Sequence, residues 1–256
     1  MTNREFVGAI PFTVMPLNEA IDLVIDKADA TNTTDDSGVA IHFCNAYNVA
    51  LARSDRDYAA LINRGDFVFS DGVPITWVGK RAKPDLAAQW ERVYGPDVME
   101  GVFARSNQQG PRHYLLGSSP EVLAALHQQL LVRFPTARIV GTESPPFRPA
   151  TPEELTERDG RIRASGATIV WVGLGTPKQD REVARLAESL PVVAIAVGAA
   201  FDFLAGTKPQ APIWMQKSGT EWLFRLASEP RRLAKRYVWG NSVFMLEAAR
   251  TLQSKR

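Results

Sequence analysis

Asp71 lies where an apolar run of the sequence ends, in the stretch FSDGVPITW (residues 69–77). Two interpretations fit its Asp-Gly pair. The pair is a common turn element, because glycine accepts positive φ angles and aspartate hydrogen-bonds its own backbone. An aspartate is also ionised near neutral pH, so its carboxylate can take a proton from a substrate hydroxyl as a general base. The residues alone favour the turn and leave the base as the second interpretation.

Glycine loops follow two other apolar runs, at residues 117–120 (GSSP) and 173–179 (GLGTPKQ). In each, a hydroxyl residue, Ser119 or Thr176, is the expected N-cap of a helix with proline at the first helical position. The free N–H groups and the positive end of such a helix can bind a phosphate or diphosphate. Capped turns are also ordinary scaffold, and residues 173–179 lack the third glycine of a dinucleotide fingerprint. Both interpretations stay open here.

The apolar runs that precede these loops alternate with segments of helical period. The expected strands are residues 39–44, 67–70, 112–117, 137–141, 168–175 and 191–198, and the expected helices are 48–65, 119–134 and 176–190. This alternation predicts an α/β fold with a mainly parallel, Rossmann-like sheet and helices on both faces. Ligands of such sheets bind beyond the carboxyl ends of the strands. Asn45, Asp71, Gly117 and Gly175 are all expected at that edge.

The composition indicates a globular protein of a reducing compartment. With 256 residues, of which 45% are hydrophobic, the chain can bury a sizeable core in one large domain or a domain with an appendage. Cys44 is the only cysteine, which excludes an internal disulfide and favours a packed strand residue. The start lacks the pattern of a signal peptide, and the longest apolar stretch, residues 192–201, is too short to cross a bilayer. We therefore expect a cytoplasmic location.

The C-terminal segment carries most of the basic charge. Residues 217–256 contain nine Lys and Arg against three Asp and Glu, net +6, which leaves 21 against 25, net −4, for the rest. Pro230 cannot lie inside a helix, so two helical segments are expected there, the second opening at Pro230. Basic residues beside aromatics suit phosphate groups or an anionic membrane surface, but also a helix packed on the body with its arginines exposed. We divide the chain into a body, residues 1–209, and a basic helical C-terminal appendage, residues 210–256.

Several segments together resemble the WecG/TagA/CpsF family of glycosyltransferases. They are SDGVPITW, ERVYG (91–95), VGLGTPKQD (172–180), AVGAAFDFLAG (196–206) and the long block QAPIWMQKSGTEWLFRLASEPRRLAKRY (210–237). The resemblance runs from about residue 39 to about residue 237 with the motifs in the same order. It implies an inverting, metal-independent transfer of an N-acetylhexosamine-type or related sugar. The donor is a nucleoside-diphosphate sugar, expected to be UDP-linked, and the acceptor is a lipid-diphosphate-linked sugar, with undecaprenyl diphosphate as the expected carrier.

The resemblance also implies roles for individual residues. Asp71 is then the general base, Gly72 lets the chain turn so that Asp71 faces the crevice, and Arg92 meets the charge of the leaving diphosphate. Tail arginines would close over the site and help to place the complex on lipid. The expected catalytic residues are Asp71 and Arg92, and the expected substrate-binding residues are Asn45, Gly72, Gly117, Gly175, Thr176, Gln179, Asp202, Arg225, Arg231, Arg232 and Arg236.

Other features limit or question this assignment. The three histidines are scattered and no His/Asp/Glu cluster is evident, so neither a metal nor another cofactor is expected. Many relatives have threonine where this chain has Phe43 and arginine where it has Gln210, which puts donor or acceptor contacts at those points in doubt. Gln179 has a second interpretation as an exposed helix residue, and Asp202 as a buried structural aspartate.

The predicted partners are the two substrates and an anionic membrane surface bound by the C-terminal helices, at the inner face of the cell membrane. No nucleic acid is expected, and a homo-oligomer is an open alternative. A protein that only binds a nucleotide sugar or a lipid phosphate is the second hypothesis for function. Asp71, Arg92 and Gln179 occurring together favour the enzyme, because a binding protein has no use for the base.

Overall fold

The computed structural model describes residues 3–31 and 37–254, which fall into two compact units. Unit 1 is formed by Met1–Leu17, Phe43–Tyr94 and Gln210–Arg256, and unit 2 by Asn18–His42 and Gly95–Pro209. The appendage, residues 210–256, therefore belongs to the same unit as Asp71 and Arg92. The division of the chain after residue 209 stays a prediction.

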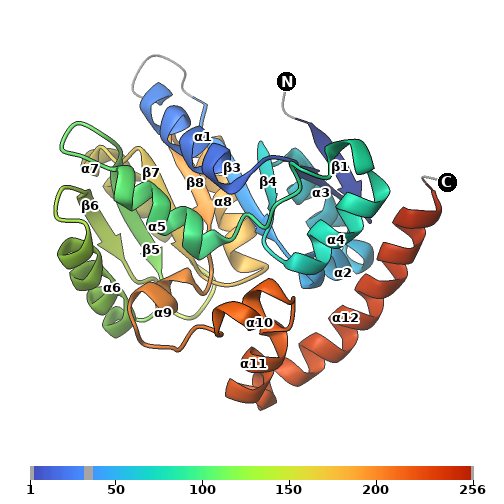
Figure 1. The fold of residues 1–256 in the computed structure, drawn as a ribbon. Coiled ribbons are helices and arrows are strands. Elements are labelled where there is room, and N and C mark those ends of the chain that lie inside the picture. The colour runs from blue at the N-terminus through green and yellow to red at the C-terminus, as the bar shows by residue number, and fades with distance from the viewer. Residues whose placement is uncertain (1–2, 32–36, 255–256) are drawn as a thin grey trace. The chain divides into compact units, whose positions relative to one another are not determined.

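The main sheet has six strands in the order β4-β3-β8-β7-β5-β6 (Figure 1). Their bounds are β3 Val39–Cys44, β4 Phe67–Ser70, β5 Arg112–Gly117, β6 Arg138–Glu143, β7 Ile169–Gly173 and β8 Val193–Ala196. The pairs β3–β8, β8–β7, β7–β5 and β5–β6 are parallel, and helices surround the sheet. The predicted α/β, Rossmann-like fold with a helical C-terminal appendage is confirmed, and all six predicted strands are present.

Unit 2 is built on the buried middle strands of this sheet. Val170, Val172, Ala194 and Ala196 pack with Leu186 of the following helix in one core. The helices that accompany the strands are α1 Leu17–Ala30, α5 Gly95–Arg105, α6 Pro120–Arg133, α7 Pro152–Ser165, α8 Lys178–Ser189 and α9 Ala200–Leu204. The helix α6 begins as predicted, because the Ser119 side chain caps Val122 N and proline follows at the first position.

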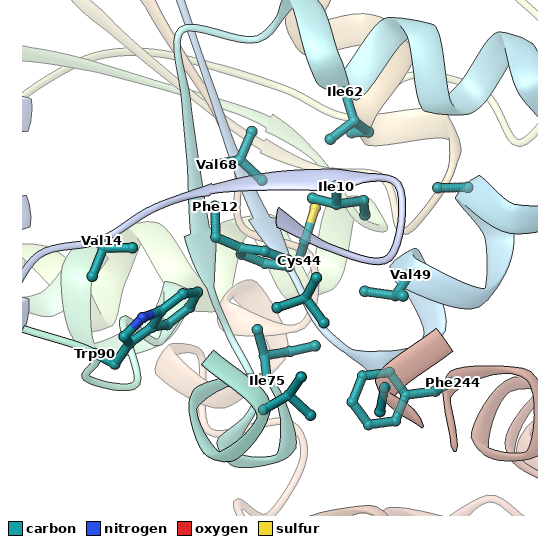
Figure 2. Close-up of a cluster of buried hydrophobic side chains, with 14 of the residues drawn as sticks. Ile10, Phe12, Val14, Cys44, Val49, Ile62, Val68, Ile75, Trp90 and Phe244 are labelled. Carbon is teal, nitrogen blue, oxygen red and sulfur yellow. The ribbon is translucent and has the colours of Figure 1, made fainter. Parts of the chain in front are cut away.

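Unit 1 has a core that the sequence did not predict. A hairpin of β1 Arg4–Val7 and β2 Ile10–Thr13 adds Ile10 and Phe12 to a cluster that also holds Trp90 (Figure 2). Cys44 lies in this cluster, which confirms that it is a packed strand residue. The helices of this unit are α2 Ala46–Ser54, α3 Arg56–Arg64, α4 Val73–Ala82, α10 Ile213–Lys217, α11 Glu221–Ser228 and α12 Pro230–Gln253, with a 3₁₀ turn at Pro84–Leu86.

The long helix α12 contributes to the same core. Phe244 is buried in the cluster (Figure 2), as is Ala248. A Cβ atom at Gly240 would lie 3.2 Å from the Tyr47 ring of α2. The helix opens at Pro230, as predicted, because proline at a first helical position loses no hydrogen bond. The segment before it differs from the prediction: two helices, α10 and α11, are separated by Ser218 to Thr220, where Gly219 has a φ of 70°.

The single helix predicted over residues 48–65 is two helices in the structure. Residues 48–65 contain the end of α2 and all of α3, with a break at Asp55. Asp55 adopts an extended conformation, and its side chain accepts a hydrogen bond from Tyr58 N. A capping carboxylate in mid-segment offers the backbone an alternative to continuing the helix, which explains the break.

Candidate active site

Asp71 lies directly after β4 and before the N-cap residue of α4, Gly72. Its backbone N–H donates to Cys44 O at 3.0 Å. Gly72 has φ −122° and ψ 136°, an extended conformation open to any residue. The expectation that Gly72 makes a turn by its special freedom is therefore wrong, and the turn interpretation of Asp-Gly loses its main reason.

Asn45 orients the carboxylate of Asp71. Its Nδ2 donates to Asp71 Oδ2 at 3.4 Å, while its Oδ1 accepts from Tyr47 N at 3.0 Å. Asn48 completes a capping box by accepting from Asn45 N, which fixes the start of α2. The local fold at the end of β3 thus holds the amide group of Asn45 against the Asp71 side chain.

Arg92 holds the same loop from the other side. Its Nε donates to Asp71 O at 2.9 Å, and its guanidinium lies 3.7 Å from the centre of the Tyr94 ring. Its Nη1 donates to Gln216 Oε1 at 3.3 Å, and its Nη2 donates to Glu221 Oε2 at 2.5 Å. Arg92 thus connects the loop of Asp71 to α10 and α11 of the appendage.

Glu221 and Tyr94 are site residues that the sequence analysis missed. The Tyr94 hydroxyl donates to Glu221 Oε1 at 3.0 Å, so the two oxygens of one carboxylate bind Tyr94 and Arg92. Burial raises the pKa of Tyr94, and the charges of Glu221 and Asp71 add to this effect. Gln210, whose contacts were in doubt, hydrogen-bonds to Tyr94. An acidic residue inside a strongly basic segment was the available signal for Glu221.

Two arginines of the appendage bring positive charge to this group. Arg225 interacts electrostatically with Tyr237, Tyr94, Glu221 and Asp71, and these charges raise its pKa although burial opposes the shift. The Arg236 guanidinium lies 3.8 Å from the centre of the Tyr47 ring. Burial lowers the pKa of Arg236, and the neighbouring charges of Arg225 and Arg232 lower it further. Unit 1 therefore holds a base candidate and two partly buried cations.

The Nε atom of Arg236 is buried and finds no hydrogen-bond partner within the part of the chain that the structure describes. Arg231 and Arg232 are different, because both are exposed at the start of α12. Arg232 pairs with Glu229 of its own helix turn. Of the four tail arginines predicted, the structure thus partly buries Arg225 and Arg236 and leaves Arg231 and Arg232 at the surface.

The predicted glycine loops lie in unit 2, at neighbouring strand ends. Gly117 pairs with Gly173 and has a φ of 132°, and a Cβ atom there would lie 2.6 Å from the Gly173 backbone. Gly175 also has a positive φ, 76°. Two tight turns, after β5 and β7, are therefore formed side by side, and each leads into a helix.

Thr176 is not the N-cap that the sequence analysis expected. The Thr176–Pro177 peptide is cis, α8 begins at Lys178, and its N-cap residue Pro177 has no side chain to accept a hydrogen bond. Gln179 closes the turn instead: its Oε1 accepts from Gly175 N at 2.9 Å, and its Nε2 donates to Ala196 O at 3.5 Å. Gln179 is buried, so the exposed interpretation is wrong.

Asp202 and Phe43 have local roles. Asp202 is partly exposed in α9, and its carboxylate pairs with Lys208 Nζ at 3.5 Å, so the buried interpretation is wrong. Phe43 is buried and packs against Phe69, with ring centres 5.7 Å apart. The side chain at position 43 therefore packs in the interior of the protein.

The sequence profile of the glycosyl transferase WecG/TagA/CpsF family matches residues 6–256, nearly the whole chain. The chain belongs to this family. The protein is thus a glycosyltransferase of the kind that acts in cell-surface polysaccharide biosynthesis, and the resemblance read from its motifs is confirmed. Within residues 3–31 and 37–254, no helix of this glycosyltransferase combines the length and apolar character needed to cross a membrane.

Proposed function

We propose that this glycosyltransferase inverts the anomeric centre and transfers an N-acetylhexosamine-type or related sugar from a UDP-linked donor to a lipid-diphosphate-linked sugar. The observation that carries the proposal is the arrangement in unit 1. The Asp71 carboxylate accepts a hydrogen bond from Asn45 and interacts electrostatically with the partly buried cation Arg225. A base and a cation for the leaving group are the two functions that such a transfer requires.

Asp71 acts as the general base. As the acceptor hydroxyl attacks the anomeric carbon, its proton passes to the Asp71 carboxylate. The bond from that carbon to the diphosphate oxygen breaks, and its electron pair leaves with UDP. The hydrogen bond from Asn45 and the backbone contacts to Cys44 and Arg92 support this role, because they fix the loop before substrate arrives.

Arg225 and Arg236 meet the negative charge that grows on the diphosphate. Both arginines are partly buried, and the Nε of Arg236 is buried without a partner in the described residues. Burial makes a charge-assisted hydrogen bond to phosphate stronger than it is in water. Two such cations support a transfer that proceeds without a divalent ion.

Taken by itself, unit 2 has a separate proposed place for phosphate or sugar oxygens at its glycine turns. The turn after β7 presents backbone N–H groups at the start of α8, where phosphate or sugar oxygens bind well. Gln179 shapes this turn through Gly175 and Ala196. Its proposed role is therefore to hold the turn in the form that binds these oxygens.

The acceptor's lipid carrier requires a peripheral position at a membrane, proposed to be its inner face. The appendage supports this, because apolar side chains of α10 and α12 are exposed on a basic segment. They are Ile213, Trp214, Val238, Trp239, Met245 and Leu246. The exposed Arg231 and Arg232 would then contact anionic lipid headgroups rather than the donor.

The test is transfer by the Asp71→Asn variant. We expect turnover to fall by about a hundredfold or more, the usual scale for a lost base, while the Kd for UDP changes less than twofold. The radiolabelled sugar and a water-soluble acceptor analogue would be used, with and without EDTA. Glu5→Gln, which removes the Lys83 partner elsewhere in unit 1, is the control. Normal turnover by Asp71→Asn would refute the assignment of Asp71 as the base. Loss of wild-type activity in EDTA would refute the metal-independent transfer.

A further inference from the structure

The contacts of Arg92 raise the question of what its charge does. The guanidinium is shared between the Asp71 backbone, Gln216 and the Glu221 carboxylate. The side chains of Arg92 and Glu221 are only 16% and 14% exposed, so their ion pair is shielded from solvent. A diphosphate that took the Nη2 of Arg92 would have to displace a carboxylate that also accepts from Tyr94.

A diphosphate at Arg92 would also lie beside the negative charge of Glu221. Like charges at such short range repel, and the low exposure of the pair makes this repulsion stronger than in water. The cations Arg225 and Arg236 offer a different place for the leaving group. The local charges therefore assign the arginines two different functions. Arg92, neutralised by Glu221, holds the loop of Asp71, whereas Arg225 and Arg236 of the appendage are available to bind phosphate.

We propose that Glu221 is a positioning residue, which holds Arg92 in place so that Arg92 fixes the Asp71 loop and ties it to the appendage. This inference rests on the proposed function only in taking Asp71 as the base. The path runs through three contacts: Glu221 to Arg92, Arg92 Nε to Asp71 O, and Tyr94 to the second oxygen of Glu221. Arg92 then serves the geometry of the base, and the donor's diphosphate does not contact Glu221.

The isosteric variant Glu221→Gln tests this role, because it removes the charge and keeps the side-chain size. We expect kcat with a soluble acceptor analogue to fall at least tenfold, while the Kd for UDP from calorimetry stays within twofold. Glu221→Asp, which keeps the charge on a shorter side chain, should recover part of the lost kcat. Glu5→Gln, which removes another ion pair of the same unit, should leave both quantities unchanged.

A second readout does not depend on catalysis. Lys217 and Arg225 are trypsin sites that flank Glu221. Loss of the ion pair should loosen α10 and α11, so Glu221→Gln should be cut in this segment at least threefold faster than the wild type. This result is expected even if the proposed sugar or acceptor is wrong, which separates the two proposals.

Four results would overturn the inference. An unchanged kcat would mean that Glu221 does not act on the base. Tighter binding of UDP by Glu221→Gln would mean that the carboxylate competes with the diphosphate for Arg92, and weaker binding that Glu221 or Arg92 contacts the donor directly. Trypsin cleavage at the wild-type rate would show that the pair does not hold the appendage.

Discussion

At the scale of single residues, the least satisfied group of the site is the guanidinium of Arg236. A buried polar atom without a hydrogen bond costs about 1–3 kcal/mol, and more when the group is charged. Arg236 Nε is in this situation within the described residues, with only the Tyr47 ring beneath the guanidinium. A phosphate oxygen would satisfy this N–H, so binding of the donor would relieve a cost that the free protein carries.

Arg236→Gln should therefore weaken UDP binding. We expect the Kd to rise by about 10- to 100-fold, the range for one charge-assisted hydrogen bond of about 1.5–3 kcal/mol. Titration calorimetry measures it, and Lys235→Gln, an exposed neighbour on α12, is the matched control. Equal affinities for Arg236→Gln and the wild type would show that the diphosphate binds elsewhere.

At the scale of elements, a buried histidine links α5, β5 and β7 in unit 2. Trp171 Nε1 donates to His113 Nδ1 at 3.2 Å, and His113 Nε2 lies 3.0 Å from Ser106 Oγ, which itself donates to Val102 O. This arrangement requires a proton on Nε2 and a free Nδ1. Protonating Nδ1 would set two donors against each other. Burial lowers the pKa of His113 to about 3.

Because His113 is buried as a neutral side chain, we expect the folded protein to lose stability in mild acid. Because the folded pKa lies below the unfolded value, the stabilisation is complete above about pH 6.5 and is lost as pH falls toward 3. At pH 5 the loss is about 2 kcal/mol, since each pH unit costs about 1.4 kcal/mol. Urea unfolding at pH 7.5 and 5 measures it, and His113→Gln should remove this part of the difference. If both proteins lose the same stability, another group is responsible.

How far the sequence predicted these elements depended on the range of the interaction. The strands were predictable because their apolar runs are local, and Ser119 because a cap acts on the next turn. The ion-pair partner of Arg92 was not predictable, since Glu221 lies 129 residues away and only the packing of the appendage brings the two residues together. The prediction that Thr176 caps the helix was wrong because the side chain of Gln179, three residues further on, closes the turn instead. Asp71 was found, but its importance came from the family resemblance and not from its spacing.

At the scale of the whole molecule, charge and apolar exposure favour a membrane-bound appendage. The net +6 of residues 217–256 is opposed by −4 elsewhere, and Ile213 and Trp214 are 69% and 67% exposed. Each basic residue near an anionic surface contributes about 1 kcal/mol, and salt screens this attraction. A handful of such residues with two inserted side chains gives reversible attachment.

The full chain should float with anionic vesicles at low salt and dissociate at high salt. The double variant Ile213→Ser and Trp214→Ser removes two large apolar groups. Because a loss of about 1.4 kcal/mol of binding free energy weakens binding tenfold, we expect the floating fraction of this variant to fall at least fivefold. Val132→Ser, an exposed apolar residue of α6, is the control and should float normally. A wild-type protein that stays with the unbound fraction at low salt would contradict the membrane proposal.

The three-segment construction of unit 1 has a consequence for synthesis on the ribosome. All segments of unit 2 have been made once Pro209 is added, whereas unit 1 still lacks Phe244 and Ala248 of its core. Glu221, Arg225 and Arg236 also emerge only after Pro209. A nascent chain can therefore fold unit 2 while Asp71 still has no appendage, so the enzyme gains its function only after the appendage has emerged.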